Sequence, residues 1–596
     1  MEKVSPSNAA CAVRFTPALW AGTLAAEAAA FLVVTAATLD GLVAAEEEGG
    51  LVAAIFSIKL AVLTMGIMPA RETFRDWTPT FLYLLTIATL GPLLFGYHLA
   101  ELNEPQDIIT CAAQQKAGPS TSTTAAPNFP QCIPMDPLQF GLVSSFFTLG
   151  GLVGALCGGP VTTKYGRLKA MLVASVFAAI GPLFEALATN IPLFATGRFI
   201  AGLGAGASTV IVPIYISEMA PPHQKGFFGS FTQVSINIGI LITQFLGLFL
   251  SRGQLWRIIL GVGGAIAVAQ FVGLFLGGQE SPKWLADNGQ PARAKRVLRK
   301  MRGHEANIDE EVMGWGLESE QDMDDEEETL LSGEDHMGNH SSSENGGAMD
   351  GQPEVEGDRQ QEAGELTHSK TAAKVEQAVK TIGFLAVLQN PDMRRAVLAV
   401  VMIMVAQQLC GINSIVMYGV SLLSDLLEAN AALLNVLVAV LNVVVTISAA
   451  PLVDKLGRKP CLLMSITGMG LNSVLLAIGI MKAVPVLSAI AVLLFVASFG
   501  LGLGPVPFLL SSELVAAEAV GATQSWALAA NWVATFVVAQ FFPLVNEKLG
   551  KGQVYFIFAA FAVLSGGLTV WLIPETKGKR DADEVWGRKK DGGRDD

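Results

Sequence analysis

Residues 164–169 read KYGRLK, and residues 454–459 read DKLGRK. The two stretches share a Gly-Arg pair, and the second pair lies 291 residues after the first. Two further motifs keep almost the same distance, because SEM recurs as SEL and QESPK recurs as PETKG, each 295 residues further along. Repetition at one spacing indicates an internal duplication, so we expect two halves with the same order of elements.

Apolar blocks of about 20 residues, the length of a helix that crosses a lipid bilayer, fill both halves. The chain of 596 residues is 51% hydrophobic and only 15% charged, which does not fit a soluble protein of this size. Lipid offers no partner for an unpaired backbone group, so the spans must be α-helical. We expect twelve spans, at 79–103, 138–162, 169–188, 192–214, 226–250, 255–277, 394–422, 430–453, 460–482, 486–510, 521–545 and 553–573.

Two six-helix halves joined by a long loop are the layout of a major-facilitator-type transporter, an all-α membrane protein. In that layout the substrate site lies between the halves, near the middle of the membrane. The expected regions are an N-terminal extension of unclear structure (1–78), an N-terminal bundle (79–277), a linker (278–393), a C-terminal bundle (394–573) and a tail (574–596).

The net charge of −13 is unevenly distributed. Residues 305–365 hold 21 Asp and Glu against one Arg, so the rest of the chain carries a net charge of +7. The basic residues gather in short loops, and the positive-inside rule therefore predicts that both termini and the linker are cytoplasmic. Within the linker, PARAKRVLRKMRG is expected to be helical, whereas residues 303–370 are expected to be disordered because they are highly charged and poorly hydrophobic.

A set of motifs resembles the sugar porter family of the major facilitator superfamily, which includes the facilitative glucose transporters. The matching stretches, between about residues 79 and 580, are FGYHLAELNEPQ, KYGRLK, GRFIAGLGAG, YISEMAPPHQKG, QESPKWL, AQQLCGIN, DKLGRK, GPVPF, NW and PETKG. The resemblance implies a fungal-type vacuolar or hexose transporter that moves a monosaccharide by alternating access. The implied partners are the sugar and the bilayer, with no nucleic acid, no cofactor, no metal and no enzymatic activity.

The seventh span holds the densest polar cluster, VAQQLCGINSIVMYG. Neutral amides suit a neutral polyol because each offers both a donor and an acceptor to hydroxyls, and the alternative role is hydrogen bonding between helices. One helix face is expected to carry Gln407, Cys410, Gly411 and Ser414, with local unwinding at Gly411. The sugar contacts that the resemblance implies are Gln233, Gln407, Gln408, Asn413, Asn442, Phe508 and Asn531.

Two positions close to the implied sugar contacts depart from the pattern of the family. Phe508 stands where many relatives have Trp, and it can still supply an apolar wall for a sugar ring. Gly500 stands where the closest glucose-specific relatives carry a glutamate, which leaves the preferred sugar open. Trp532 is expected to pack rather than to bind.

Charged residues at matching places in the two halves are candidates for a gating network. Opposite charges at helix ends of one half can pair in one state and separate in another, and several such pairs can bias a two-state equilibrium. The alternative is that these charges only mark the membrane interface. The expected network, at or just inside the cytoplasmic helix ends, comprises Arg167, Arg198, Glu218, Glu280, Arg458, Glu513 and Glu575.

The first span carries a histidine at a position that is an Asp in the proton-coupled sugar porters, close to the Arg of the fourth span. Here these two residues are His98 and Arg198, so the usual carboxylate is missing. Facilitative uniport is therefore the leading expectation. Glu101 could restore a carboxylate, but it lies nearly a turn further on, so a capping or rim role is expected for it. The alternatives are proton-coupled transport with His98 as the titrating group, and a sugar sensor that binds without transporting.

Two features outside the spans bear on the cellular compartment. Cys111 and Cys132 flank a loop on the side opposite the cytoplasm, where a disulfide between them is expected. EEETLL, with Glu326, Leu330 and Leu331, fits an acidic dileucine signal that a coat adaptor would bind, although a solvated acidic tether is the alternative. This signal favours a vacuolar or other internal membrane over the plasma membrane.

Overall fold

The structure is a computed structural model. It describes residues 78–112, 130–221, 224–303, 308–313, 386–427, 430–516, 519–550, 552–579 and 582–587. Every described residue belongs to the unit Phe74–Asp596. Nearly all of the expected N-terminal extension and most of residues 303–370, with Glu326, Leu330 and Leu331, lie outside the described residues. The expected disorder is wrong for residues 309–313, which form the short helix α14 (Asp309–Met313), because Ile308 and Val312 pack against Leu298.

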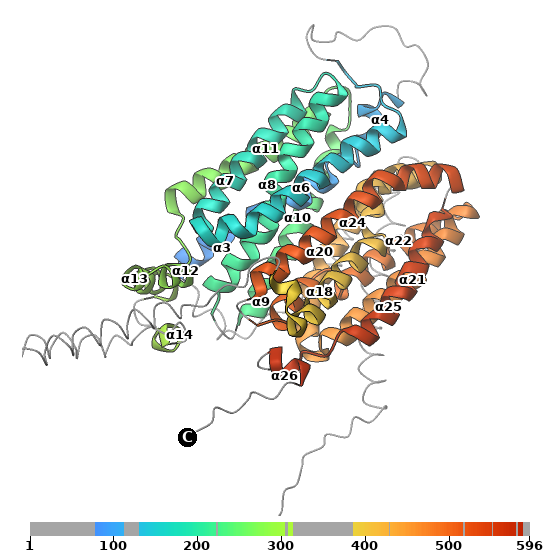
Figure 1. The fold of residues 1–596 in the computed structure, drawn as a ribbon. Coiled ribbons are helices and arrows are strands. Elements are labelled where there is room, and N and C mark those ends of the chain that lie inside the picture. The colour runs from blue at the N-terminus through green and yellow to red at the C-terminus, as the bar shows by residue number, and fades with distance from the viewer. Residues whose placement is uncertain are drawn as a thin grey trace, which may run out of the picture. The chain divides into compact units, whose positions relative to one another are not determined.

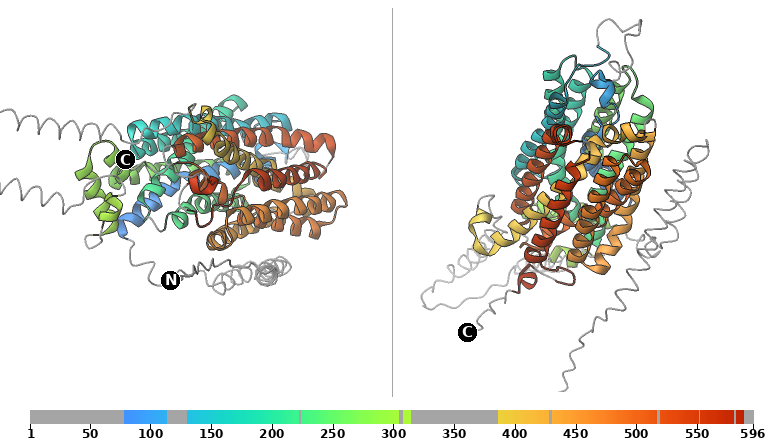
Figure 2. Two further views of the ribbon diagram at one scale, coloured as in Figure 1. Left: turned by 60° about the horizontal axis from the view of Figure 1, so that its bottom comes forward. Right: turned by 90° about the vertical axis from the view of Figure 1, so that its right-hand side faces the viewer.

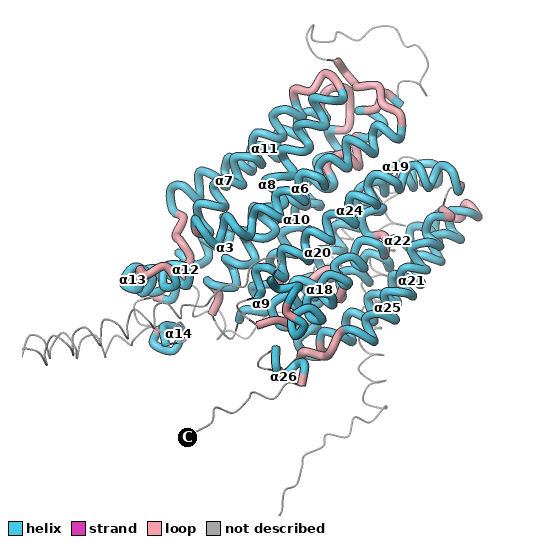
Figure 3. Tube along the Cα trace, viewed as in Figure 1, coloured by secondary structure: helices cyan, strands magenta, loops and turns pink. Residues whose placement is uncertain are grey.

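The described elements are all helices, joined by the loops seen in Figure 3. Within the described residues, twelve stretches are long and apolar enough to cross a membrane, and each coincides with an expected span. The N-terminal half contains α3 (Pro79–Ala100), α6 (Pro137–Tyr165), α7 (Arg167–Ala186), α8 (Ile191–Met219), α10 (Phe231–Leu250) and α11 (Trp256–Gly277). The C-terminal half contains α18 (Pro391–Leu409), α19 (Ile412–Leu427), α20 (Asn430–Leu456), α21 (Arg458–Met481), α22 (Pro485–Leu501), α23 (Val506–Glu513), α24 (Val520–Leu549) and α25 (Val554–Leu572).

The two halves lie side by side, with the first half in blue and green and the second in yellow to red (Figure 1). They meet mainly where α6 packs on α24 and where α10 packs on α20. The two further views of Figure 2 show the long helices of both halves running in the same general direction. A solute that passes between the halves would therefore travel along the helix axes.

Glycines allow helices of the N-terminal half to pack at backbone distance. A Cβ atom on Gly202 of α8 would lie 2.1 Å from the carbonyl oxygen of Phe147 in α6, and one on Gly206 would lie 2.0 Å from that of Gly151. Real side chains do not tolerate such distances. The motif GLGAG is therefore a helix-packing motif, a common use of small residues in membrane helices.

Two spans of the C-terminal half are interrupted. The seventh span breaks between α18 and α19, where Gly411 adopts a φ of +97°, as the expected unwinding requires. The tenth span breaks between α22 and α23, over residues 502–505. Interrupted helices free backbone groups to face a cavity in the middle of a transporter.

Short helices mark the two ends of the bundles. At one end, here called the basic end, lie α9 (Lys225–Gly229), α12 (Pro282–Asp287), α13 (Pro291–Arg302), α14 (Asp309–Met313), α17 (Ala386–Gln389) and α26 (Ala582–Trp586). The opposite end, here called the disulfide end, carries α4 (Gln106–Ile109). Helix α13 is the one expected from PARAKRVLRKMRG, and it buries Val297 and Leu298 while exposing Arg296.

Candidate functional site

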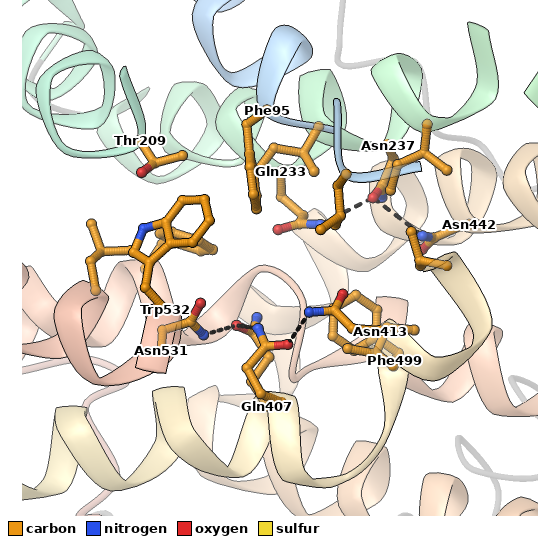
Figure 4. A pocket seen from close by; sticks show the side chains of 18 residues that line it. Phe95, Thr209, Gln233, Asn237, Gln407, Asn413, Asn442, Phe499, Asn531 and Trp532 are labelled. Carbon is orange, nitrogen blue, oxygen red and sulfur yellow. Dashed lines mark hydrogen bonds between the residues drawn. The ribbon is translucent and has the colours of Figure 1, made fainter. Parts of the chain in front are cut away.

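A pocket between the halves collects all seven residues implied as sugar contacts. Its empty space measures about 580 Å³, part of it open to solvent. The expected residues that line it are Gln233, Gln407, Gln408, Asn413, Asn442, Phe508 and Asn531. Figure 4 shows most of these side chains pointing into one space from both halves.

Gln407, near the end of α18, connects three elements of the C-terminal half. Its Nε2 donates to the carbonyl oxygen of Leu503, 2.6 Å away in the interrupted tenth span. Its Oε1 accepts from Nδ2 of Asn531 at 2.8 Å and from Nε2 of Gln408 at 3.2 Å. Buried amides of this kind are held in place by their neighbours, which orients them before a solute arrives.

The interruption at Gly411 decides which residues of the seventh span face the pocket. Asn413 lies just after the break, and its Nδ2 donates to Oε1 of Gln408 at 2.6 Å. Ser414 instead hydrogen bonds with the Tyr555 hydroxyl of α25, 3.1 Å away, and is not on the pocket wall. The expectation that Gln407 and Ser414 share one face is therefore wrong, because that spacing assumed an uninterrupted helix.

The N-terminal half contributes Gln233 and a residue that the sequence reasoning missed, Asn237. Both lie on α10, and Nε2 of Gln233 donates to Oδ1 of Asn237 at 3.0 Å. The same Oδ1 accepts from Nδ2 of Asn442 on α20 at 3.2 Å, and Nδ2 of Asn237 donates to Oγ1 of Thr446 at 2.8 Å. The spacing of four residues between Gln233 and Asn237 is the signal that could have identified it.

Aromatic residues form the apolar part of the wall. Phe508 lines the pocket as expected, together with Phe95 and Phe499. Trp532 was expected only to pack, but it also lines the pocket, while its ring contacts that of Phe147 at a centroid distance of 5.9 Å. Aromatic faces beside amides suit a ligand with both C–H and hydroxyl surfaces.

The charged residues of the basic end pair within each half. Arg167 donates to Glu218 through Nε at 2.8 Å and through Nη2 at 2.6 Å. Arg458 occupies the equivalent place in the second half, and its Nη2 lies 2.8 Å from Glu513. A two-pronged contact between Arg and a carboxylate is stronger and more directional than a single one.

A second glutamate lies beside each of these ion pairs: Glu280 in the first half and Glu575 in the second. Each accepts hydrogen bonds from the first backbone N–H groups of a helix. Glu280 accepts from the backbone nitrogen of Arg167 at 2.8 Å, and Glu575 accepts from that of Arg458 at 3.0 Å. Burial raises the pKa of the Glu280 carboxyl, and these N–H groups act in the opposite direction. The glycine before each arginine has a positive φ, and a Cβ on Gly166 would lie 2.3 Å from Glu280 Oε2.

Arg198 does not belong to the basic end, so its expected place there is wrong. It lies near the start of α8, at the end opposite Glu218, and its side chain is fully buried. Its Nη1 donates to the carbonyl oxygen of His98 at 2.8 Å and also contacts Oε1 of Glu101. Oε2 of Glu185, on α7, lies 4.0 Å from the same Nη1.

Glu101 restores the carboxylate that His98 removes from the first span. Its expected rim position is wrong, because the residue is only 1% exposed. Oε2 of Glu101 lies 3.0 Å from Nδ1 of His98, so the histidine and Arg198 contact the same carboxyl. The sequence reasoning ranked this role below a capping or rim role because Glu101 follows the last residue of α3.

The disulfide end contains the expected bond between Cys111 and Cys132. The backbone beside it is tied to α11, because Nε1 of Trp256 donates to the carbonyl oxygen of Gln131 at 2.9 Å. Arg257 also donates to the carbonyl oxygen of Pro130 at 3.1 Å. The disulfide therefore anchors a loop whose ends pack on the N-terminal half.

Comparison with known proteins identifies relatives along most of the chain. The family model described as "Sugar (and other) transporter" matches residues 84–342 and 336–583. The "Probable metabolite transport protein YBR241C" of Saccharomyces cerevisiae is 32% identical over 531 residues, which covers 88% of this chain and 99% of the relative. The yeast "Vacuolar protein sorting-associated protein 73" is 29% identical over 524 residues, covering 87% of this chain and 98% of the relative.

More distant relatives include facilitated glucose transporter member 2 of Sus scrofa, which is 27% identical and covers 84% of this chain and 92% of its own. Among solved structures, the xylose transporter XylE from E. coli in a partially occluded inward-open conformation has a TM-score of 0.60 and 24% sequence identity. That match covers 84% of this chain and 100% of XylE, and it shows the same fold. The chain therefore belongs to the sugar porter family of the major facilitator superfamily, whose members are transporters and not enzymes.

Proposed function

We propose that the protein moves a monosaccharide, most simply a hexose, across a membrane by alternating access. The observation that carries the proposal is the convergence of neutral amides from both halves on one pocket, with aromatic rings beside them. Amides can donate to and accept from hydroxyls, and no counter-charge is needed for a neutral solute. A hydroxyl-rich solute can replace the hydrogen bonds that Gln407, Gln408 and Asn413 now make with one another.

Contacts between the halves at the disulfide end are the ones that opening toward that side would break. Oδ1 of Asn103 accepts from the backbone nitrogen of Val420 at 3.1 Å. Nearer the pocket, Oγ of Ser145 donates to Oε1 of Gln540 at 2.8 Å. We infer that the ion pairs Arg167–Glu218 and Arg458–Glu513 act at the other end, where they bias the equilibrium between the two states.

The test of transport is uptake of radiolabelled hexose by purified protein in proteoliposomes. Uptake should depend on Gln407 and Asn413, and leucine at both positions should abolish it without unfolding the protein. Leucine in place of Asn472, a buried amide of α21 that donates to the carbonyl oxygen of Gly468, is the matched control. Sugar binding without uptake would favour a sensor, and an unaltered affinity in the double variant would refute the sugar site.

Proton-coupled transport is a second candidate, because Glu101 supplies the carboxylate whose absence favoured uniport. Arg198 faces two carboxyls, Glu101 and Glu185, and His98 contacts the first of them. With both carboxyls ionised and His98 neutral, one positive charge would face two negative charges in a buried place. Uncompensated buried charge is costly, so this arrangement favours holding one proton.

A pH-sensitive dye inside the proteoliposomes distinguishes the two modes. Uniport predicts no proton movement when sugar is added. Proton coupling predicts acidification of the proteoliposome interior that disappears in Glu101→Gln or Glu185→Gln, whereas coupling through the histidine predicts its loss in His98→Ala alone. Glu104→Gln, which changes a carboxyl that packs against Gly247 of α10, is the matched control.

We also propose that the protein resides in an internal membrane. The acidic dileucine of Glu326, Leu330 and Leu331 supports this, as does the similarity to a yeast protein named for vacuolar protein sorting. Alanine at both leucines should move a fluorescently tagged protein to the plasma membrane. An unchanged distribution would refute recognition of this signal by a coat adaptor.

A further inference from the structure

Asn237 joins the two halves of the protein at the pocket wall. It lies on α10 of the N-terminal half and is only 1% exposed. Its Oδ1 accepts from Asn442 and its Nδ2 donates to Thr446, and both of these partners belong to α20 of the C-terminal half (Figure 4 shows the first bond). The bridge thus lies at a point that the halves must leave or remake when they move.

The two ends of this bridge differ in their access to the pocket. Asn237 and Asn442 line it, whereas Thr446 is not among the described residues that do so. The amide of Asn237 carries two hydrogens, and the bond to Thr446 uses one of them. A hydroxyl entering the pocket can therefore insert between Asn237 and Asn442 while Thr446 continues to hold the Asn237 amide in place.

The space beside this bridge is where position 500 would place a side chain. A Cβ atom on Gly500 would lie 3.3 Å from Oγ1 of Thr446 and 3.4 Å from Oδ1 of Asn442. A longer group at this position would grow toward the amide and hydroxyl groups that Asn237 contacts. With glycine there, the polar contacts on this side of the pocket come from neutral amides of both halves, Asn442 from one and Gln233 and Asn237 from the other.

We propose that Asn237 is a specificity-determining residue that binds one sugar hydroxyl together with Asn442, so that a single hydroxyl contacts both halves. This inference rests on the proposed transport of a monosaccharide. It assigns the choice among sugars to a neutral hydroxyl at one ring position. Sugars that lack this hydroxyl lose both contacts at once.

The experiment combines Asn237→Leu with the monodeoxy analogues of glucose, using displacement of labelled glucose from purified protein. One analogue should bind the wild-type protein about 5- to 10-fold more weakly than glucose, the factor expected for one net hydrogen bond. Asn237→Leu should lower the affinity for glucose by a similar factor and leave the affinity for that analogue unchanged. The same variant should lose as much affinity for each of the other analogues as it loses for glucose.

Thr446→Val is the matched control because it breaks the same bridge from behind the pocket wall. If Asn237 only holds α10 against α20, both variants will lower the affinity for glucose and for every analogue by one common factor, and the inference is refuted. If the leucine variant does not fold, Asn237→Ser, which is shorter but still polar, goes through the same comparison. Failure of the wild-type protein to bind any hexose would refute the proposed function as well, which separates the two failures.

Discussion

Replacing Glu101 and Glu185 with glutamine, singly and together, tests how the buried Arg198 is neutralised. The two carboxyls differ in their contact, because Glu101 bonds directly to Nη1 of Arg198 whereas Glu185 lies 4.0 Å from the same atom. Both changes preserve side-chain shape, so packing stays nearly constant. The difference between the variants therefore reports electrostatics.

The size of each effect follows from these contacts. Glu101→Gln keeps a neutral hydrogen bond and leaves Glu185 as counter-ion, so it should lower the free energy of unfolding by about 1–2 kcal/mol. Glu185→Gln should lower it by less than Glu101→Gln does, because the direct pair between Glu101 and Arg198 remains and Glu185 lies 4.0 Å from the guanidinium. The double variant leaves the fully buried Arg198 without a carboxylate and should lower it by about 3–5 kcal/mol.

The assay is chemical unfolding of the purified protein in mixed micelles, with all variants at one pH. The loss of unfolding free energy in the double variant should exceed the sum of the losses in the two single variants by about 1–2 kcal/mol, as expected for residues that share a partner. Glu584→Gln, in a pair with Lys579 whose side chains are 47% and 41% exposed, is the control and should change little. Strictly additive effects, or a larger loss in Glu185→Gln than in Glu101→Gln, would refute this account of Arg198.

Three further predictions concern other parts of the structure. Gln407→Leu removes the hydrogen bonds of Gln407 to the tenth span, to Gln408 and to Asn531, so sugar affinity should fall about 10- to 100-fold in a binding assay, and an unchanged affinity would contradict its role. Gly166→Ala forces a Cβ to within 2.3 Å of Glu280 and should lower the melting temperature, whereas Gly521→Ala, with open space around it, should not. Burial raises the pKa of Glu104 from 4.5 to about 8. Its protonated form therefore contributes to the free energy of unfolding in full below pH 4.5, and this contribution is lost as the pH rises to about 8. The melting temperature of the wild-type protein, measured between pH 4.5 and about 8, should fall as the pH rises, and that of Glu104→Gln should fall less.

Features that depend on composition and local spacing could be predicted from the sequence. The length of the apolar blocks identified the twelve spans. The offset between the Gly-Arg motifs identified two halves, in which Arg167 and Arg458 occupy equivalent places at the basic end. The residues implied as sugar contacts came from the resemblance to the family, and the structure brings them to one pocket. These inferences needed only the order of residues along the chain.

Features that depend on where the chain turns could not be predicted. A regular helix through Gly411 would place Ser414 near Gln407, but the positive φ of the glycine turns the serine toward Tyr555. Glu101 was assigned a capping or rim role because it follows the first span, yet it is buried in contact with His98 and with Arg198 of the fourth span. The contact of Asn237 with Asn442 joins residues 205 positions apart, and no local pattern signals such a pairing.

The self-contained charge sets of the basic end have a consequence for how the protein can be assembled. Arg167, Glu218 and Glu280 satisfy one another inside the first half, and Arg458 has its own carboxylates in the second. Each arginine therefore has carboxylate partners from its own half, and we expect neither bundle to need covalent continuity to complete its charge set. A polypeptide severed between Met313 and Ala386 and produced as two co-expressed fragments should thus reassociate and regain uptake by complementation.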